Sequence, residues 1–147
     1  MVKKRLLVAI ISLLTLVSAQ PTLSDEPNYT VAAILPLSGP VASWGNYVKN
    51  GIDLALEEMP KSERARIRVV FEDDQFDPLK TIANYRKLKS LGEVNAVLVV
   101  GSAPGNGLGP ITEHDRTPLI AVGASDPNNS GWKKLLFHSC GHSGCLG

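Results

Sequence analysis

The chain has 147 residues, of which 44% are hydrophobic and 20% charged, the composition of an ordinary globular domain with a sizeable core. Its 15 Lys and Arg residues nearly balance its 14 Asp and Glu residues, for a formal charge of +1. No basic stripe is present, so nucleic-acid binding has no support.

The first 19 residues have the pattern of a cleavable secretory signal peptide. Lys3-Lys4-Arg5 is a basic start, Leu6 to Val17 is apolar, and Ser18-Ala19 supplies small residues before a cut at Gln20. The alternative is an uncleaved anchor, but about a dozen apolar residues fall short of the roughly 20 that a transmembrane helix needs. Cleavage leaves 12 basic and 14 acidic residues, a formal charge of −2.

This amino terminus predicts where the mature protein resides. No Cys lies near the cut, which excludes lipid attachment there, so we expect a periplasmic or extracellular protein. Residues 20–28 are polar, contain Pro21 and Pro27, and predict a disordered leader. The domain itself begins at Tyr29.

The domain opens with a strand and a helix. The apolar run Thr30–Leu35 predicts a strand that is covered on both faces. Apolar residues at three- and four-residue steps predict a helix over 41–58, which Pro60 stops; they are Tyr47, Val48, Ile52, Ala55, Leu56 and Met59. Gly45 and Gly51 lower helix propensity by roughly 1 kcal/mol each relative to Ala. Close packing of this helix on the sheet would explain them.

A second strand and helix follow, joined by an acidic turn. The strand is predicted over 67–71 and the helix over 78–91, with Ile82, Tyr85, Leu88 and Leu91 on one face of the helix. Asp77 before Pro78 suits a helix start, because its carboxylate can accept from unpaired N–H groups. The cluster Glu72, Asp73, Asp74 and Asp77 lacks the spacing and closing Glu of a calcium loop, which favours a solvated, capped turn over a Ca²⁺ site.

The centre of the chain repeats this alternation. A strand over 94–100 ends in the glycine-rich turn 101–107, a helix of about 106–114 follows, and a strand over 119–122 ends in Gly123-Ala124-Ser125. Strands that alternate with helices imply right-handed crossovers and a parallel sheet. The predicted fold is therefore a three-layer α/β lobe.

Two of these strands end in glycine followed closely by serine. Carboxyl-end loops of parallel strands are where ligands bind, and the hydroxyls of Ser102 and Ser125 could donate to one anionic group. The alternative is that glycine and serine simply make good turns. No GxGxxG or Walker loop is present, neither serine lies in a GxSxG elbow, and His114 falls on a polar, surface-type stretch. We therefore expect no cofactor and no catalysis.

The end of the chain is less regular. Residues 132–137 predict a further strand, and 138–147 show no apolar periodicity. The tail carries His138, Cys140, His142 and Cys145, whose spacing matches no standard zinc site; in an exported protein the two cysteines could instead pair.

Four segments in register resemble the type I periplasmic solute-binding proteins of the leucine/isoleucine/valine-binding branch. They are VAAILPLSGPVASWGNYVKNGIDLALEE, VVFEDDQFDPLKTIANYRKL, VLVVGSAPGNGLGPITEH and TPLIAVGASDP, and the likeness extends over roughly Thr30 to Phe137. The resemblance implies a ligand-binding amino-terminal lobe over 29–137, truncated before the second lobe. It also implies a small-molecule ligand, an amino acid or similar solute, that a membrane permease of an ABC transporter receives from a monomeric binding protein.

The resemblance also implies binding residues. Trp44 would cover the apolar part of the ligand, Ser102 with Ala103 would meet the carboxylate, and the strand-four turn would add the backbone of Gly123. Ser125, where the family often has Thr, would contribute its hydroxyl and N–H. The acid that usually pairs with the ammonium group lies in the second lobe and has no counterpart here.

The tail departs from the family, which usually continues after the equivalent of Phe137 with a stretch resembling Trp-Val-Thr-Pro-Glu. A frame shifted by one nucleotide can encode Val, Thr and Pro here, so we expect residues 138–147 to be a frameshifted end. A ligand-sensing module of a receptor is the alternative function, because the same lobes serve there.

Overall fold

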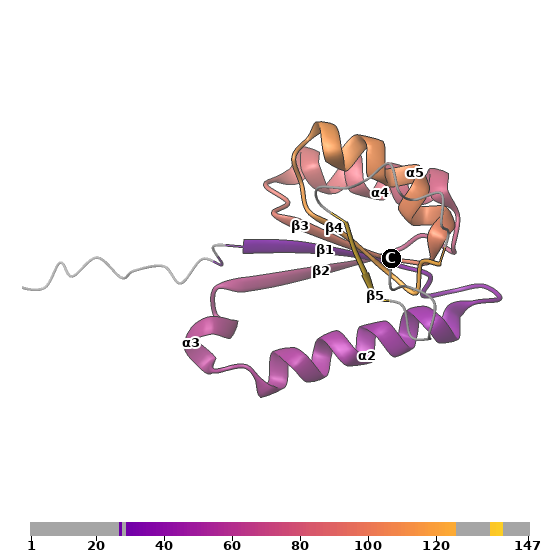
Figure 1. The fold of residues 1–147 in the computed structure, drawn as a ribbon. Helices are drawn as coiled ribbons and strands as arrows, with labels where there is room; N and C mark the ends of the chain where they lie inside the picture. Colours follow the sequence, from indigo (N-terminus) through magenta and orange to yellow (C-terminus); the bar gives the residue numbers. More distant parts are fainter. Residues whose placement is uncertain (1–26, 28, 126–135, 140–147) are drawn as a thin grey trace, which may run out of the picture.

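The computed structural model describes residue 27, residues 29–125 and the backbone of residues 136–139 (Figure 1). The predicted signal peptide at 1–19, most of the predicted leader at 20–28 and the tail from 140 onward lie outside these residues. The elements in chain order are β1 (Tyr29–Leu35), α2 (Ala42–Glu58), α3 (Lys61–Arg64), β2 (Ile67–Asp73), α4 (Pro78–Leu91), β3 (Ala96–Val100), α5 (Ser102–His114), β4 (Leu119–Val122) and β5 (Leu136–Ser139).

The strands form one sheet in the order β2-β1-β3-β4-β5, and every neighbouring pair is parallel. Helix α2 lies on one face, while α4 and α5 lie side by side on the other (Figure 1). The predicted three-layer α/β fold is therefore confirmed. Parallel strands place all their carboxyl ends at one edge of the sheet, and this edge carries the loops considered below.

The first strand is an interior strand of the sheet, paired with β2 on one side and β3 on the other. At its start the N–H of Thr30 donates to Oδ1 of Asn95 at 2.7 Å, and the N–H of Asn95 donates to the Thr30 carbonyl at 2.8 Å. This reciprocal pair joins residues 65 positions apart and fixes the register between β1 and the segment entering β3.

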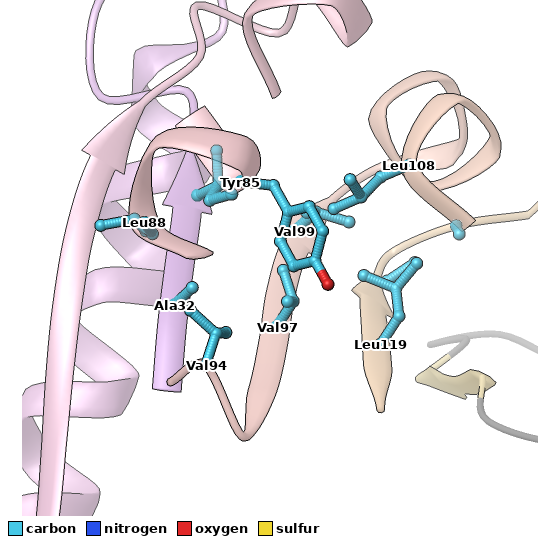
Figure 2. Close-up of a cluster of buried hydrophobic side chains, with 11 residues drawn as sticks. Ala32, Tyr85, Leu88, Val94, Val97, Val99, Leu108 and Leu119 are labelled. Atoms are coloured by element: carbon cyan, nitrogen blue, oxygen red, sulfur yellow. The ribbon is translucent and has the colours of Figure 1, made fainter. Parts of the chain in front are cut away.

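The main hydrophobic core lies between the sheet and the α4–α5 layer. Tyr85 is its largest fully buried side chain, and its hydroxyl lies 2.9 Å from Oδ2 of Asp115 and 3.1 Å from Oγ1 of Thr117. Burial raises the pKa of the Tyr85 hydroxyl, which therefore stays protonated as a donor. Figure 2 shows the ring of Tyr85 over the strands, with Ala32, Leu88, Val94, Val97, Val99, Leu108 and Leu119 around it.

The opposite face of the sheet is covered less completely. Here α2 packs Val48 and Ile52 against a smaller cluster that contains Leu35 and Val100. Three predictions for helix faces were wrong: Tyr47 of α2 is 74% exposed, Ala55 of α2 is exposed, and Leu91 of α4 is 75% exposed. Helical spacing aligned each with the apolar side, but the buried stripe of each helix is narrower than that spacing predicts.

Close packing explains one of the two glycines of α2. A Cβ added to Gly45 would lie 2.2 Å from the carbonyl oxygen of Pro36, whereas a Cβ on Gly51 would meet nothing within 4 Å. The expectation of close packing is thus confirmed for Gly45 and wrong for Gly51, which faces open space.

Helix α4 runs over the predicted residues, with Pro78 first and the Asp77 carboxylate accepting from the N–H of Leu79 at 2.9 Å. Helix α5 begins at Ser102, four residues before its predicted start. The residues expected to form a glycine-rich loop instead form the start of this helix. A Cβ at Gly105 would lie only 3.1 Å from that of Ala121, so the glycine allows the helix to pack closely on β4. Tight packing on β4 thus outweighs the poor helix propensity of glycine.

The remaining boundaries differ by a few residues. Strand β3 begins at Ala96 and not at 94, β2 continues to Asp73, and α3 is a short helix that the sequence pattern did not predict. Strand β5 covers Leu136–Ser139, which agrees with the predicted strand at 136–137 and enters the segment expected to be an irregular tail; residues 132–135 of that prediction lie outside the described residues. Within the residues that the structure describes, no helix has the length and apolar character needed to cross a membrane.

Candidate functional site

The turns that follow β3 and β4 meet at the carboxyl edge of the sheet. The two strands are neighbours in register, and the N–H of Ser125 donates to Oγ of Ser102 at 3.0 Å. The predicted convergence of the two serines is therefore present. The geometry differs in one respect, because the Ser125 N–H is already used by Ser102; the two hydroxyl protons are what the pair can offer to a ligand.

The amino terminus of α5 supplies the strongest group of donors at this edge. The first N–H groups of an α-helix lack intrahelical acceptors, and in this 13-residue helix they belong to Ser102 and Ala103. Pro104 has no N–H, and no side chain caps the helix at Gly101. Backbone N–H groups and the helix dipole thus both favour an anion here.

An apolar hollow of about 340 Å³ adjoins these donors. It lies between the first turns of α2 and the ends of β3 and β4, and Trp44, 54% exposed, forms one wall. No charged side chain of the described residues lines it. The lining residues are Trp44, Tyr47, Val48, Val100, Gly101, Val122 and Gly123.

The backbone conformation explains why glycine follows both β3 and β4. Gly101 has φ +83° and Gly123 has φ +67°, the left-handed region that other residues seldom adopt. At each of these glycines the chain turns away from its strand immediately. The residues that follow therefore lie at the carboxyl edge of the sheet. The five predicted binding residues are therefore together: Trp44 and Gly123 line the hollow, and Ser102, Ala103 and Ser125 lie at the helix terminus beside it.

The acidic turn after β2 connects the loops of this edge. One oxygen of Asp73 accepts from the N–H groups of Leu37 and Ser38, at 2.9 and 3.3 Å, in the loop that follows β1. The other oxygen accepts from the Ser38 hydroxyl at 2.5 Å. Asp73 thereby fixes the loop that leads into α2 and to Trp44.

The two neighbouring carboxyl groups of this turn have opposite pKa shifts. Burial acts to raise the pKa of Asp73, but its hydrogen bonds from Ser38, Gln75 and Leu37 outweigh burial and hold the pKa below the usual value. For Asp74 burial dominates and raises the pKa. Its side chain is completely buried, with 2.9 Å from Oδ1 to the Phe76 N–H and 2.8 Å from Oδ2 to the Thr81 hydroxyl.

The acidic turn is thus capped, as predicted, but it is not solvated throughout, because Asp74 lies inside. Its carboxylates accept from N–H and O–H groups, which explains why the cluster does not present them to an ion. Across the described ranges, no group of three or more His, Cys, Asp or Glu side chains is arranged to hold a metal. His114 is exposed at the end of α5 and pairs with Asp115, at 3.1 Å.

Two residues beside the site were absent from the prediction. Tyr47 lines the hollow, and the ring of Phe76 packs against Gly101. A signal for Phe76 was present in the sequence, since it is a lone aromatic residue in an otherwise acidic turn.

A family model described as periplasmic binding protein matches residues 28–140 of the chain. Among curated proteins, the Leu/Ile/Val-binding protein homolog 3 of Brucella melitensis is 24% identical over 119 residues, which cover 78% of this chain and 32% of that protein. The chain thus spans about a third of the length of the relative it matches.

Solved structures share the fold. The leucine-binding protein LivK of Thermotoga maritima superposes with a TM-score of 0.68 at 24% identity, over 76% of this chain and 32% of that one. LivJ of Streptococcus pneumoniae, in complex with isoleucine, gives 0.68 at 20% identity, over 76% and 33%. A solute-binding protein of Rhodopseudomonas palustris with 3,4-dihydroxybenzoic acid gives 0.66 at 20% identity, over 75% and 31%.

Proposed function

The chain belongs to the periplasmic binding protein family, and from that premise we propose that it is the extracytoplasmic solute-binding component of an ABC importer. Its ligand would be a branched-chain amino acid or a related small solute that carries a carboxylate. The described lobe would supply one half of the binding site, and a membrane permease would receive the solute. The predicted signal peptide would deliver the chain, as a monomer, to the periplasm or the cell exterior.

One observation carries the proposal. An apolar hollow beside Trp44 adjoins the amino terminus of α5, where the backbone of Ser125 meets the hydroxyl of Ser102. An amino acid has the matching pair of groups, because its carboxylate suits the N–H and O–H donors and an aliphatic side chain suits the hollow. Isoleucine and 3,4-dihydroxybenzoic acid, the ligands of two similar structures, each carry a carboxylate on a hydrocarbon framework.

A nuclear magnetic resonance titration of the ¹⁵N-labelled chain tests the proposal. L-Leucine should shift the amide signals of Ser102, Ala103 and Ser125 and leave the amino edge of the sheet unchanged. We expect weak binding, with a Kd on the order of 1 mM, because one lobe provides only part of the contacts and no closure.

Leucinol is the matched control, since it keeps the isobutyl and amino groups of leucine and lacks only the carboxylate. It should leave these three amides in place. Equal shifts with leucine and leucinol, or shifts confined to other parts of the lobe, would contradict a carboxylate site at α5.

A further inference from the structure

We propose that Phe76 is a positioning residue of this ligand site: its ring sets the distance between the aromatic wall at Trp44 and the anion-binding end of α5. The inference deepens the proposed function and rests on it for the identity of the ligand. It assigns a role to the acidic turn, which contains none of the binding residues that were predicted from the sequence.

The backbone at Phe76 is held in an unfavourable conformation. Gln75 and Phe76 have φ values of 54° and 65°, two successive non-glycine residues in the left-handed region. Each such residue costs about 1–2 kcal/mol relative to the right-handed conformation. A turn of this kind persists only where its surroundings stabilise it.

Two carboxylates provide that stabilisation. Oδ1 of Asp73 accepts from the Gln75 N–H at 3.0 Å, and Oδ1 of Asp74 accepts from the Phe76 N–H at 2.9 Å. The Asp77 N–H then donates to the Asp74 carbonyl at 2.9 Å and closes the turn before α4. Each left-handed residue therefore has its own carboxylate acceptor, and the direction in which the Phe76 side chain leaves the backbone is fixed.

The ring of Phe76 reaches both halves of the site. A Cβ placed on Gly101 would lie 2.6 Å from Cε2 and 2.9 Å from Cζ of the ring, so the ring packs directly against the Gly101 backbone. Its centroid lies 6.3 Å from that of Trp44, with the two planes at 89° in an edge-to-face pair. Such pairs contribute beyond the area that they bury.

The consequence for binding follows from these contacts. Gly101 is the residue before Ser102, so the ring supports the start of α5 from below while it contacts the half-exposed Trp44. One rigid side chain thereby sets the spacing between the apolar wall and the carboxylate donors. That spacing determines how large a side chain a ligand can place between its carboxylate and Trp44.

A ligand-free measurement isolates the positioning role. In a Trp132→Phe background, the fluorescence of Trp44 is the only tryptophan signal of the chain. Phe76→Leu should raise acrylamide quenching of Trp44 about twofold, because a side chain that is 54% exposed becomes free to rotate into solvent. Leu79→Ala is the matched control, since Leu79 lies three residues away and is 75% exposed. Unchanged quenching in a folded Phe76→Leu variant would overturn the proposal.

A mutant cycle covers the case in which Phe76→Leu folds poorly. Gly101→Ala should lower the melting temperature strongly in the parent, where the new methyl group meets the ring, and clearly less in a Phe76→Ala background. The left-handed φ of Gly101 contributes equally to both and cancels. An identical loss in the two backgrounds would show that the ring does not support Gly101.

Binding separates this inference from the proposed function. Phe76→Leu should weaken L-leucine binding about tenfold through lost preorganisation, and should weaken L-phenylalanine binding less, because the wider gap accepts a larger side chain. An unchanged leucine-to-phenylalanine preference with unchanged Trp44 quenching overturns the inference while leaving the proposed function intact. No amino-acid binding by the parent, together with the quenching change, overturns the function and supports the positioning.

Discussion

The Ser125 N–H donates to Oγ of Ser102 across 3.0 Å and joins the turns after β3 and β4. Accepting this bond leaves the hydroxyl proton of Ser102 available to a ligand carboxylate. Ser102→Ala removes both interactions. We expect L-leucine binding to fall about tenfold to about a hundredfold, because a hydrogen bond to a charged group contributes about 1.5–3 kcal/mol. The same titration of the labelled chain measures the change.

A second serine serves as the control for this substitution. The Ser90 hydroxyl donates to the Lys87 carbonyl at 2.7 Å on the exposed carboxyl end of α4, from which the chain enters the amino end of β3. Ser90→Ala should leave leucine binding unchanged. A loss of binding equal to that of Ser102→Ala would show that the effect is not local to the strand-end serines.

Two glycines of α2 form a matched pair for stability. Gly45→Ala should lower the free energy of unfolding by about 1–3 kcal/mol or more, because its Cβ would lie 2.2 Å from the carbonyl oxygen of Pro36. A Cβ at Gly51 would meet nothing within 4 Å. Gly51→Ala should therefore raise the free energy of unfolding by about 0.5–1 kcal/mol, since alanine favours the helix. Urea denaturation measures both, and two changes of the same sign would contradict the packing described for α2.

The buried carboxyl group of Asp74 makes stability depend on pH. Its pKa is raised in the folded chain, so its favourable contribution is fully present below the unfolded pKa of about 3.9 and is lost as pH rises through the folded pKa. Asp74→Asn removes the ionisable group and with it this loss of stability. The amide oxygen of the new side chain can still accept from the Phe76 N–H. The variant should therefore gain stability relative to the parent as pH increases from about 3 to about 7, measured by urea denaturation across that range.

Asp73 should behave in the opposite way. Its pKa is lowered, so its contribution is present above about 3.9 and is lost as pH falls through the folded pKa. The parent should exceed Asp73→Asn in stability at neutral pH, and the difference should shrink in acid. Parallel profiles for the Asp73 and Asp74 variants would contradict the assignment of opposite environments to these neighbours.

The hydroxyl of Tyr85 is the polar group at the centre of the main core. Tyr85→Phe should lower the free energy of unfolding by about 1–3 kcal/mol, because it leaves the buried Thr117 without this partner and removes the bond to Asp115. Tyr47→Phe is the control, at a side chain that is 74% exposed, and should change stability by less than about 0.5 kcal/mol. Thermal denaturation of both variants gives the comparison.

Periodicity predicted the strand–helix order because burial imposes it. The runs that became β1, β3 and β4 are apolar, since a parallel sheet is covered on both faces. The start of α5 could not be predicted in the same way. Its glycines disfavour a helix locally, and only the close approach of Gly105 to Ala121 of the following strand, a contact visible in three dimensions alone, shows why the helix includes them.

The site was predictable to a similar degree. Glycine and serine at two strand ends, together with the resemblance, indicated the residues that the structure brings together at one edge. Phe76 could not be placed, because its role depends on a left-handed turn and on a contact with Gly101 across the sheet edge. Neither the conformation nor the contact leaves a periodic trace in the sequence.

The reciprocal bonds between Thr30 and Asn95 also constrain how the chain acquires its fold. Strand β1 is made first, yet one of its two partner segments begins 65 residues later, so a nascent chain cannot complete the pairing of β1 until that segment is synthesised. Sheets that depend on such long-range pairing fold slowly. For a chain exported as proposed, the delay would keep it unfolded long enough to be threaded through a secretion channel.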